Sequence, residues 1–447
     1  MLDLIIRGGQ VVLPGNVLTI DVGIHEGRIV KLERDLGEAK QIIEAQSMTV
    51  FPGMVDAHVH FGEPGRSHWE GYTTGTRAAA KGGVTTCIEM PQNQIPASLD
   101  ASTLHTKFQA GEGKLWVDIA SLGALSDQSS EAGMLELAEE GVVGFKCFMS
   151  PCGDPAEPLD QHQVSDHQLL RGMRAIAALD KVLMVHAENG SICDGLTRDL
   201  RSEGKTGLSD FLSAHPIYCE VEAVRRAIYL AGVAGCRLHI CHISSIEAVE
   251  EVASARRHGQ DVSCEVCPHF LIFDSSDLLR LGTVLKCSPP LRGAEQREAL
   301  WGAVQSGAID FIASDHSPCP PEMKAKDGLD AWGGTAAVQT SLEMIYSEAV
   351  CRRGLPVHLL AHLMARNPAQ RFGLTQKGAI ALGADADLVL LKHEPYSLTE
   401  SMLEYRHRLS PYLGMTSLVK VQATILRGAL IYSDETGFGA KPEGRYI

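Results

Sequence analysis

Residues 51–60, FPGMVDAHVH, decide the fold of this chain. The segment has the length and apolar character of a buried β-strand, and its two histidines, His58 and His60, are two positions apart. Successive side chains of a strand point to opposite faces, so these two project from the same face. The segment therefore predicts a strand that carries a pair of metal ligands.

Four later segments repeat this form, each an apolar run of buried-strand length closed by a polar residue. They are GVVGFK, KVLMVH, RLHICH and DFIASD, which end at Lys146, His186, His242 and Asp315. In a (β/α)₈ barrel the C-terminal ends of all strands face one cavity. We therefore expect these side chains to converge, although they are far apart in the sequence.

Strand-like runs alternate with helical stretches through the middle of the chain, as a parallel barrel requires. The predicted strands are residues 55–60, 84–90, 117–122, 143–148, 183–187, 238–242, 262–266 and 311–315. Helical candidates such as TTGTRAAAKG and EVEAVRRAIYLAG separate them. The sequence thus predicts an α/β protein whose residues 54–372 form a (β/α)₈, or TIM, barrel.

The two chain ends read differently, as short β-like runs divided by glycine-rich turns. Residues 1–53 contain LIIRGG and DVGIHEGRIVKLE, and residues 373–447 contain KGAIALGADADLVLLK and VKVQATILRGALIYSD. The chain of 447 residues is also longer than the ~250 that one barrel needs. We expect the two ends to build one small β-sandwich domain together.

Composition indicates an ordinary globular protein, with 45% hydrophobic and 21% charged residues. The net charge of −15 argues against a broad surface for nucleic acid or an anionic membrane. The apolar stretch in MLDLIIRGGQ is too short for a signal peptide and no run reaches transmembrane length, so we expect a cytoplasmic location. The twelve cysteines, including the lone Cys264-x-x-Cys267, lack a framework spacing and are expected to be reduced and structural.

Lys146 is the unusual member of the predicted cluster. A lysine ammonium has no acceptor, so it cannot bind a metal and would be repelled by two dications. Reaction with CO₂ would convert the side chain into a carbamate, an anion whose two oxygens could bridge two metals. The residue makes sense in this position only if its charge is changed in such a way.

The chain resembles the cyclic amidohydrolases of the amidohydrolase superfamily, and among them the allantoinases, over essentially its whole length. The resemblance is carried by residues 53–91 (GMVDAHVHFGEPGRSHWEGYTTGTRAAAKGGVTTCIEMP), by GVVGFKCF, VAGCRLHICHISS, KCSPPLR and SDHSPCPPEMK, and by AWGG. It implies a binuclear centre held by an H-x-H pair, a carboxylated lysine, two histidines and an aspartate. The matching positions are His58, His60, Lys146 (as N6-carboxylysine), His186, His242 and Asp315.

The resemblance also implies an activity. A hydroxide bridging two metals would attack the cyclic amide of the hydantoin ring of (S)-allantoin and give allantoate, a step of purine (ureide) degradation. Asp315 would be the catalytic acid and base as well as a ligand. The metals would be two divalent ions per chain, zinc first, with cobalt, manganese or nickel also compatible. Bicarbonate or CO₂ would supply the carbamate, and a homotetramer is expected.

Two departures bear on the substrate. Dihydroorotases usually carry an arginine two residues after the second histidine, where this chain has Gly62, so a neutral ring is favoured over dihydroorotate. Dihydropyrimidinases and hydantoinases carry a tyrosine five residues after the lysine, where this chain has Pro151. By resemblance the substrate contacts are Ser288, Trp332 and Gly333.

Several alternatives stay open at this point. The chain could be a hydantoinase or dihydropyrimidinase acting on another cyclic ureide, or a non-catalytic scaffold of the same fold. Glu63, Arg66, His68 and Glu70, in the loop after the first barrel strand, either touch substrate or brace the loop. His316 and Ser317 are expected to support the ligands from behind, and His269 either does the same or is structural.

Overall fold

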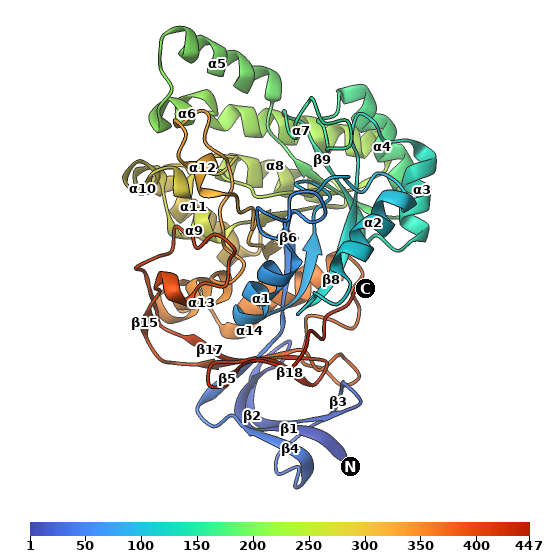
Figure 1. Ribbon diagram of the computed structural model, residues 1–447, viewed down its shortest axis with the longest axis vertical. Coiled ribbons are helices and arrows are strands. Elements are labelled where there is room, and N and C mark those ends of the chain that lie inside the picture. The colour runs from blue at the N-terminus through green and yellow to red at the C-terminus, as the bar shows by residue number, and fades with distance from the viewer.

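Eight parallel strands form the barrel at the centre of the computed structural model, which describes residues 1–447 (Figure 1). They are β6 (Met54–Val59), β7 (Val84–Glu89), β8 (Asp118–Ala124), β9 (Gly144–Phe148), β10 (Val182–His186), β11 (Arg237–Ile240), β12 (Val262–Val266) and β13 (Phe311–Ile312). Neighbours in the sheet are neighbours in the sequence. A parallel bridge between Val59 of β6 and His316, in the segment after β13, brings the two ends of this sheet together. The predicted (β/α)₈ barrel is confirmed.

The barrel strands are apolar because both of their faces are covered. Every residue of β6, β7, β8, β9, β10 and β12 is buried. Helices lie outside the strands, as a parallel sheet requires. Those that follow β6 to β10 are α1 (Tyr72–Lys81), α2 (Ala101–Gly111), α3 (Glu131–Glu139), α4 (Asp166–Ala178), α5 (Gly190–Ser202), α6 (Leu208–Ala214) and α7 (Ile217–Ala234).

The second half of the chain contributes the remaining helices. They are α8 (Ile246–Arg257), α9 (Pro268–Ile272), α10 (Ser275–Leu281), α11 (Ala294–Ser306), α12 (Pro321–Lys324), α13 (Ser341–Tyr346), α14 (Val357–Ala361) and α15 (Asn367–Arg371). Irregular single turns η1 (Gly282–Leu285), η2 (Ser347–Arg352), η3 (His362–Arg366) and η4 (Glu400–Met402) complete them. No helix is both long and apolar enough to cross a membrane.

Both chain ends build the second β-domain, seen as the blue and red strands below the barrel in Figure 1. Its sheet has nine strands: β1 (Leu2–Val12), β2 (Val17–His25), β3 (Arg28–Glu33), β4 (Ala39–Glu44), β5 (Met48–Pro52), β14 (Leu388–Lys392), β17 (Lys420–Leu426), β18 (Ala429–Ser433) and β19 (Gly437–Phe438). One edge of β1 pairs with β4 over its first half and with β5 over its second. The antiparallel pairing of β5 with β14 unites the two ends.

A core of 14 buried residues lies within this domain and draws on both ends, with Ile6 and Ile24 meeting Leu388 and Ile425. The composite β-domain expected from the sequence is therefore present. The C-terminal end also reaches the barrel, where Ile447 N–H donates to Ile119 O at 3.0 Å. We propose that residues 1–53 and 373–447 form this domain and residues 54–372 the barrel domain. A small ladder, β15 (Tyr396–Ser397) with β16 (Thr416–Ser417), stands apart from both sheets.

Candidate functional site

One cavity of about 680 Å³ opens beyond the C-terminal ends of the barrel strands. All nine side chains or backbone positions predicted for the site line it: His58, His60, Lys146, His186, His242, Ser288, Asp315, Trp332 and Gly333. Its volume is in the ordinary range for a small-molecule site. The strand pattern in the sequence therefore led to residues that share one space.

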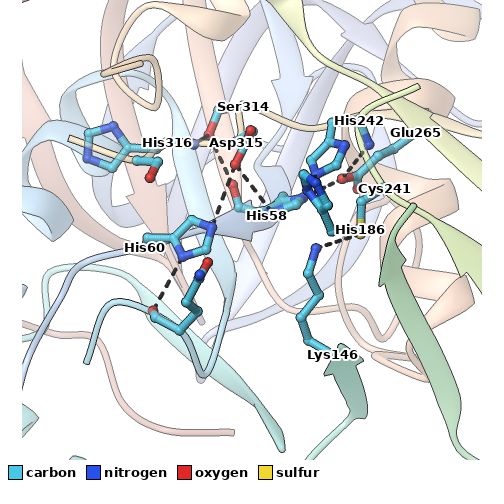
Figure 2. Close-up of polar contacts among 12 residues, drawn as sticks. His58, His60, Lys146, His186, Cys241, His242, Glu265, Ser314, Asp315 and His316 are labelled. Atoms are coloured by element: carbon cyan, nitrogen blue, oxygen red, sulfur yellow. Dashed lines mark hydrogen bonds and ion pairs between the residues drawn. The ribbon is translucent and has the colours of Figure 1, made fainter. Parts of the chain in front are cut away.

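The barrel strands set where each predicted ligand lies (Figure 2). His58 belongs to β6 and His60 follows it directly, His186 is the last residue of β10, and His242 and Asp315 lie just beyond β11 and β13. Lys146 differs from the expectation that it ends its strand. It is the third residue of β9, because β9 continues to Phe148 in register with His186 of β10.

His58, His60 and Asp315 form one compact group. The Nε2 atoms of His58 and His60 lie 3.3 and 3.6 Å from Oδ1 of Asp315. One ligand atom from each residue lies within 4.8 Å of the other two. Two imidazoles and a carboxylate at this spacing suit a divalent transition metal.

His186 and His242 form a second pair beside the first group. Nδ1 of His186 and Nε2 of His242 are 2.9 Å apart, and Nδ1 of His242 is buried without a hydrogen-bond partner. Burial, followed by the nearby His186, lowers the pKa of His242 well below its usual value, and burial does the same to the pKa of His58. His58 and His242 are therefore neutral at physiological pH, which is the form that binds metal.

Lys146, on barrel strand β9, is fully buried. Its Nζ donates to Sγ of Cys241 at 2.9 Å and lies 4.9 Å from the ring centroid of Phe148. No carboxylate lies within ion-pair distance of this ammonium. A buried charge without a counter-charge is unfavourable, so the position suits a lysine whose charge has been changed.

Backbone strain marks two of the predicted ligands. His242 and Asp315 adopt positive φ angles of 35° and 46°. Residues other than glycine rarely adopt this conformation, and where they do so it is often at a functional site. Burial alone would raise the pKa of Asp315, but the surrounding His58, His60 and His242 hold that pKa below its ordinary range. The side chain is therefore a carboxylate at neutral pH.

Glu265, the fourth residue of β12, was missed in the sequence interpretation. It contacts His58 Nδ1 and lies 3.3 Å from both His239 Nε2 and the backbone N–H of His242. Such a carboxylate fixes the ring orientation and raises the basicity of a ligand histidine. Its signal in the sequence was a single acidic residue inside the apolar run VSCEV. Glu188 plays the same part for His186, with Oε2 at 3.0 Å from Nε2.

Residues of the loop after β6 were expected either to touch substrate or to brace the loop, and the structure shows both kinds. Arg66 and His68 line the cavity, and Arg66 forms an ion pair with the buried Asp160 at 2.5 Å. Glu63 instead accepts from the backbone N–H of Tyr72 at 2.8 Å, and Glu70 from that of Arg406 at 3.1 Å. These two carboxylates brace the loop.

The three residues expected to support the ligands also differ in whether they reach the cavity. Ser317 lines the cavity, whereas His269 and His316 do not. His316 accepts the backbone N–H of Ala337 at Nδ1, at 3.1 Å, and thereby helps to hold the segment after β13.

Ser288, Trp332 and Gly333 lie together at one wall of the cavity. A Cβ atom added to Gly333 would come within 2.9 Å of Ser288 Oγ, so the backbone passes close to this hydroxyl. The indole N–H of Trp332 donates to Ser317 O at 3.1 Å, and its ring meets that of Trp69 edge to face at 4.9 Å. Trp69, which the sequence did not single out, also lines the cavity.

Comparison with known proteins agrees with this geometry. The model of the amidohydrolase family matches residues 49–431. The chain belongs to the amidohydrolase family. It is 49% identical over 446 residues to allantoinases of Escherichia coli O139:H28 (strain E24377A / ETEC) and O9:H4 (strain HS), covering 100% of this chain and 98% of each relative.

Solved structures of related amidohydrolases share the fold over the whole chain. L-hydantoinase (dihydropyrimidinase) from Arthrobacter aurescens superimposes with a TM-score of 0.96 at 31% identity, covering 100% of both chains. Dihydropyrimidinase from Brevibacillus agri NCHU1002 gives a TM-score of 0.92 at 28% identity, covering 100% of this chain and 98% of that one. The barrel with its attached β-domain is thus an architecture shared with these enzymes.

Proposed function

We propose that this protein is a metal-dependent cyclic amidohydrolase that opens the hydantoin ring of (S)-allantoin to give allantoate. The observation that carries the proposal is the convergence of His58, His60, Lys146, His186, His242 and Asp315 on one cavity. The chain that holds them is 49% identical to allantoinases over its full length. A non-catalytic scaffold would have no need of this donor set.

The donor set suits two divalent metal ions, zinc first, with cobalt, manganese or nickel as alternatives. His58, His60 and Asp315 would hold one ion, and His186 and His242 the other, with a carboxylated Lys146 between them. The facing ring nitrogens of His186 and His242, 2.9 Å apart, fit a shared cation, and the lack of any counter-charge at Lys146 fits its conversion to an anion. When bound, such a pair supplies a nucleophile from water at neutral pH and polarises the scissile carbonyl.

The chain's own groups would then move the proton. Asp315 is a carboxylate that faces the cavity, so it would accept the proton of the attacking water and pass it to the leaving ring nitrogen. Ser288 Oγ and the backbone at Trp332 and Gly333 would orient the ring. Trp69 and Trp332 would cover it and exclude bulk water.

The cavity favours a neutral ring over a carboxylate substrate. Gly62 has φ +70°, and a Cβ atom there would lie 3.1 Å from Arg66 O and 3.3 Å from Asn93 O. An arginine at this position would therefore be strained. Arg66 does line the cavity, but Asp160 already balances its charge through a contact to Nη2. Gly62 therefore offers no bidentate partner for a carboxylate, and Arg66 is not an unpaired cation.

A hydantoinase or dihydropyrimidinase activity is the second candidate, because the solved structures above belong to such enzymes. Pro151 lines the cavity where those families carry a tyrosine, so the hydroxyl would come from elsewhere. Ser150 and Ser288 both line the cavity and could replace it. This difference favours allantoin.

The proposal extends to the setting of the enzyme. We infer a cytoplasmic homotetramer that takes CO₂ or bicarbonate for the carboxylation of Lys146 and a cyclic ureide as its small-molecule substrate. The net charge of −15 supports the exclusion of nucleic acid and anionic membranes as partners.

The direct test supplies the protein with bicarbonate and a divalent metal, adds racemic allantoin, and follows both enantiomers and the appearance of allantoate. We expect the S enantiomer to be consumed first, and stripping the metals to abolish turnover. No allantoate from metal-loaded, carboxylated protein would refute the proposal.

A further inference from the structure

A second group of ligand-type side chains lies on the wall of the cavity, outside the six residues assigned above. Glu188 follows β10, Cys193 belongs to α5, and His215 precedes α7. All three line the cavity. One carboxylate oxygen, the thiol sulfur and one ring nitrogen lie within 4.8 Å of one another. Residues from three separate elements thus meet at one point.

Glu188 lacks a partner on one side. The residue is 2% exposed, and Oε2 contacts His186 Nε2 at 3.0 Å, but Oε1 is buried without any hydrogen-bond partner. A buried carboxylate oxygen that receives no hydrogen bond is costly. A cation bound at this carboxylate would remove that cost.

The other two members can supply the remaining ligands. His215 Nδ1 lies 3.1 Å from Phe211 O, so it carries the ring proton and leaves a lone pair on Nε2. Cys193 is 4% exposed, yet its side chain reaches the cavity. Thiolate, imidazole and carboxylate together are a donor set that zinc prefers.

We propose that Glu188, Cys193 and His215 form a third metal site, for a divalent cation of borderline softness such as zinc. The site has three protein ligands and one position open to the cavity. On binding, Cys193 gives its thiol proton to solvent, and the sulfur, the free imidazole nitrogen and a carboxylate oxygen each donate an electron pair to the cation.

A cation bound at this site would affect the catalytic centre through Glu188. The same carboxylate contacts His186, so a cation would draw negative charge away from that ring and also narrow the cavity. Excess zinc would therefore slow ring opening. This consequence rests on the proposed function, whereas binding at the third site does not.

Cobalt(II) is a suitable probe, because thiolate ligation gives a charge-transfer absorption that imidazole and carboxylate ligation do not. None of the six proposed catalytic ligands carries sulfur. The metal-loaded protein, kept reduced, is titrated with cobalt(II) beside three variants. The parent and Cys351→Ser, which removes the exposed cysteine, should show the absorption saturating at about one further ion per chain. Cys193→Ser should lose it, and His215→Asn should weaken the binding by about tenfold or more.

An absorption that persists in Cys193→Ser would overturn the proposal and point to another thiol, either Cys241 beside His58 and Glu265 or Cys267 beside His269 and Asp315. Absence of the absorption in the parent would overturn it equally. If Cys193→Ser fails to fold, undiminished binding by His215→Asn would serve as the contradicting result. Inhibition by excess zinc should be weaker in His215→Asn than in the parent. If the protein shows the cobalt absorption but does not hydrolyse allantoin, the proposed function is refuted and the third metal site is still supported.

Discussion

Lys146 is the residue whose surroundings depart furthest from ordinary protein chemistry. It is fully buried, and its only polar contact is the thiol of Cys241 at 2.9 Å. By contrast, the buried Lys107 has Glu89 at 3.0 Å. Lys146 shares its site with four histidines and Asp315, yet no carboxylate lies within ion-pair distance of its ammonium. These surroundings fit an anionic, carboxylated form that binds metal.

Replacement of Lys146 tests this directly. Lys146→Ala should lose metal and lower kcat/KM by more than about 100-fold. Removal of a group that only supports a ligand costs up to about 100-fold, and loss of a ligand itself should cost more. Short-chain carboxylic acids should restore part of the activity, because they supply the missing anion. Lys107→Met, which removes the buried lysine outside the site, serves as the control and should show no such rescue. Full activity in Lys146→Ala would remove the carbamate from the mechanism.

The sequence predicted most of the candidate site at this scale, for a physical reason. Strand-end residues of a parallel barrel share one cavity, so their type and position in apolar runs were enough to find His58, His186, His242 and Asp315. Glu265 was missed because one acidic residue in a buried strand does not reveal which histidine it faces. Trp69 was missed because loop conformation decides which side chains of residues 61–71 reach the cavity.

At the scale of elements, α13 is tied to the later strands through a buried acid. Glu343 accepts from Val421 N–H of β17 at 2.6 Å and from the Tyr396 hydroxyl of β15. Burial raises the pKa of Glu343 to about 7, although these hydrogen bonds oppose the rise. The folded chain therefore favours the protonated form of this side chain.

This coupling predicts a pH dependence of stability. The folded pKa lies above the unfolded one, so the contribution of Glu343 is complete below the unfolded pKa and is lost as pH rises through about 7. The pKa difference from 4.5 to about 7 corresponds to at most about 3 kcal/mol. Glu343→Gln should lose less stability than the parent between about pH 5 and pH 8. Urea unfolding at both pH values measures this, with the exposed Glu250→Gln as control; equal losses in parent and Glu343→Gln would contradict it.

The positions of the barrel strands were predicted closely from the hydrophobic pattern of the sequence. All eight barrel strands fell where apolar runs of strand length alternate with helical stretches. For β9 the run GVVGFK placed the strand end at Lys146, whereas the range 143–148 placed it at Phe148, where the structure has it, because strand length is set by the register with β10, a property of the pair. The branched pairing of β1 with both β4 and β5 escaped prediction for the same reason.

At the scale of the whole molecule, Lys377 joins the two β-structures. Its Nζ lies 2.6 Å from Asp118 of the barrel strand β8, and 2.9 and 2.8 Å from Asp385 and Asp387 beside β14. All four side chains are buried. Lys377 is the only ion-pair partner of Asp387, so its loss would leave that carboxylate without a counter-charge.

Lys377→Met should therefore destabilise the chain by about 3–5 kcal/mol, the usual cost of breaking a buried ion pair on one side. Lys392→Met on β14 removes an exposed lysine paired with Glu394, and its effect on stability should be far smaller because water screens that pair. Denaturant unfolding of both variants measures the difference. Equal stability of the two would show that the buried network does not hold the barrel and the β-domain together.

The central claim concerns the ring that the cavity accepts. Initial rates of the metal-loaded, bicarbonate-supplied protein on (S)-allantoin, hydantoin, dihydrouracil and dihydroorotate, measured side by side, test it most directly. The strained Gly62 position and the charge of Arg66, already balanced by Asp160, predict negligible turnover of dihydroorotate, and the similarity to allantoinases predicts a clear preference for allantoin. Faster turnover of hydantoin or dihydrouracil would contradict the proposed substrate, and turnover of none of the four would contradict the proposed chemistry.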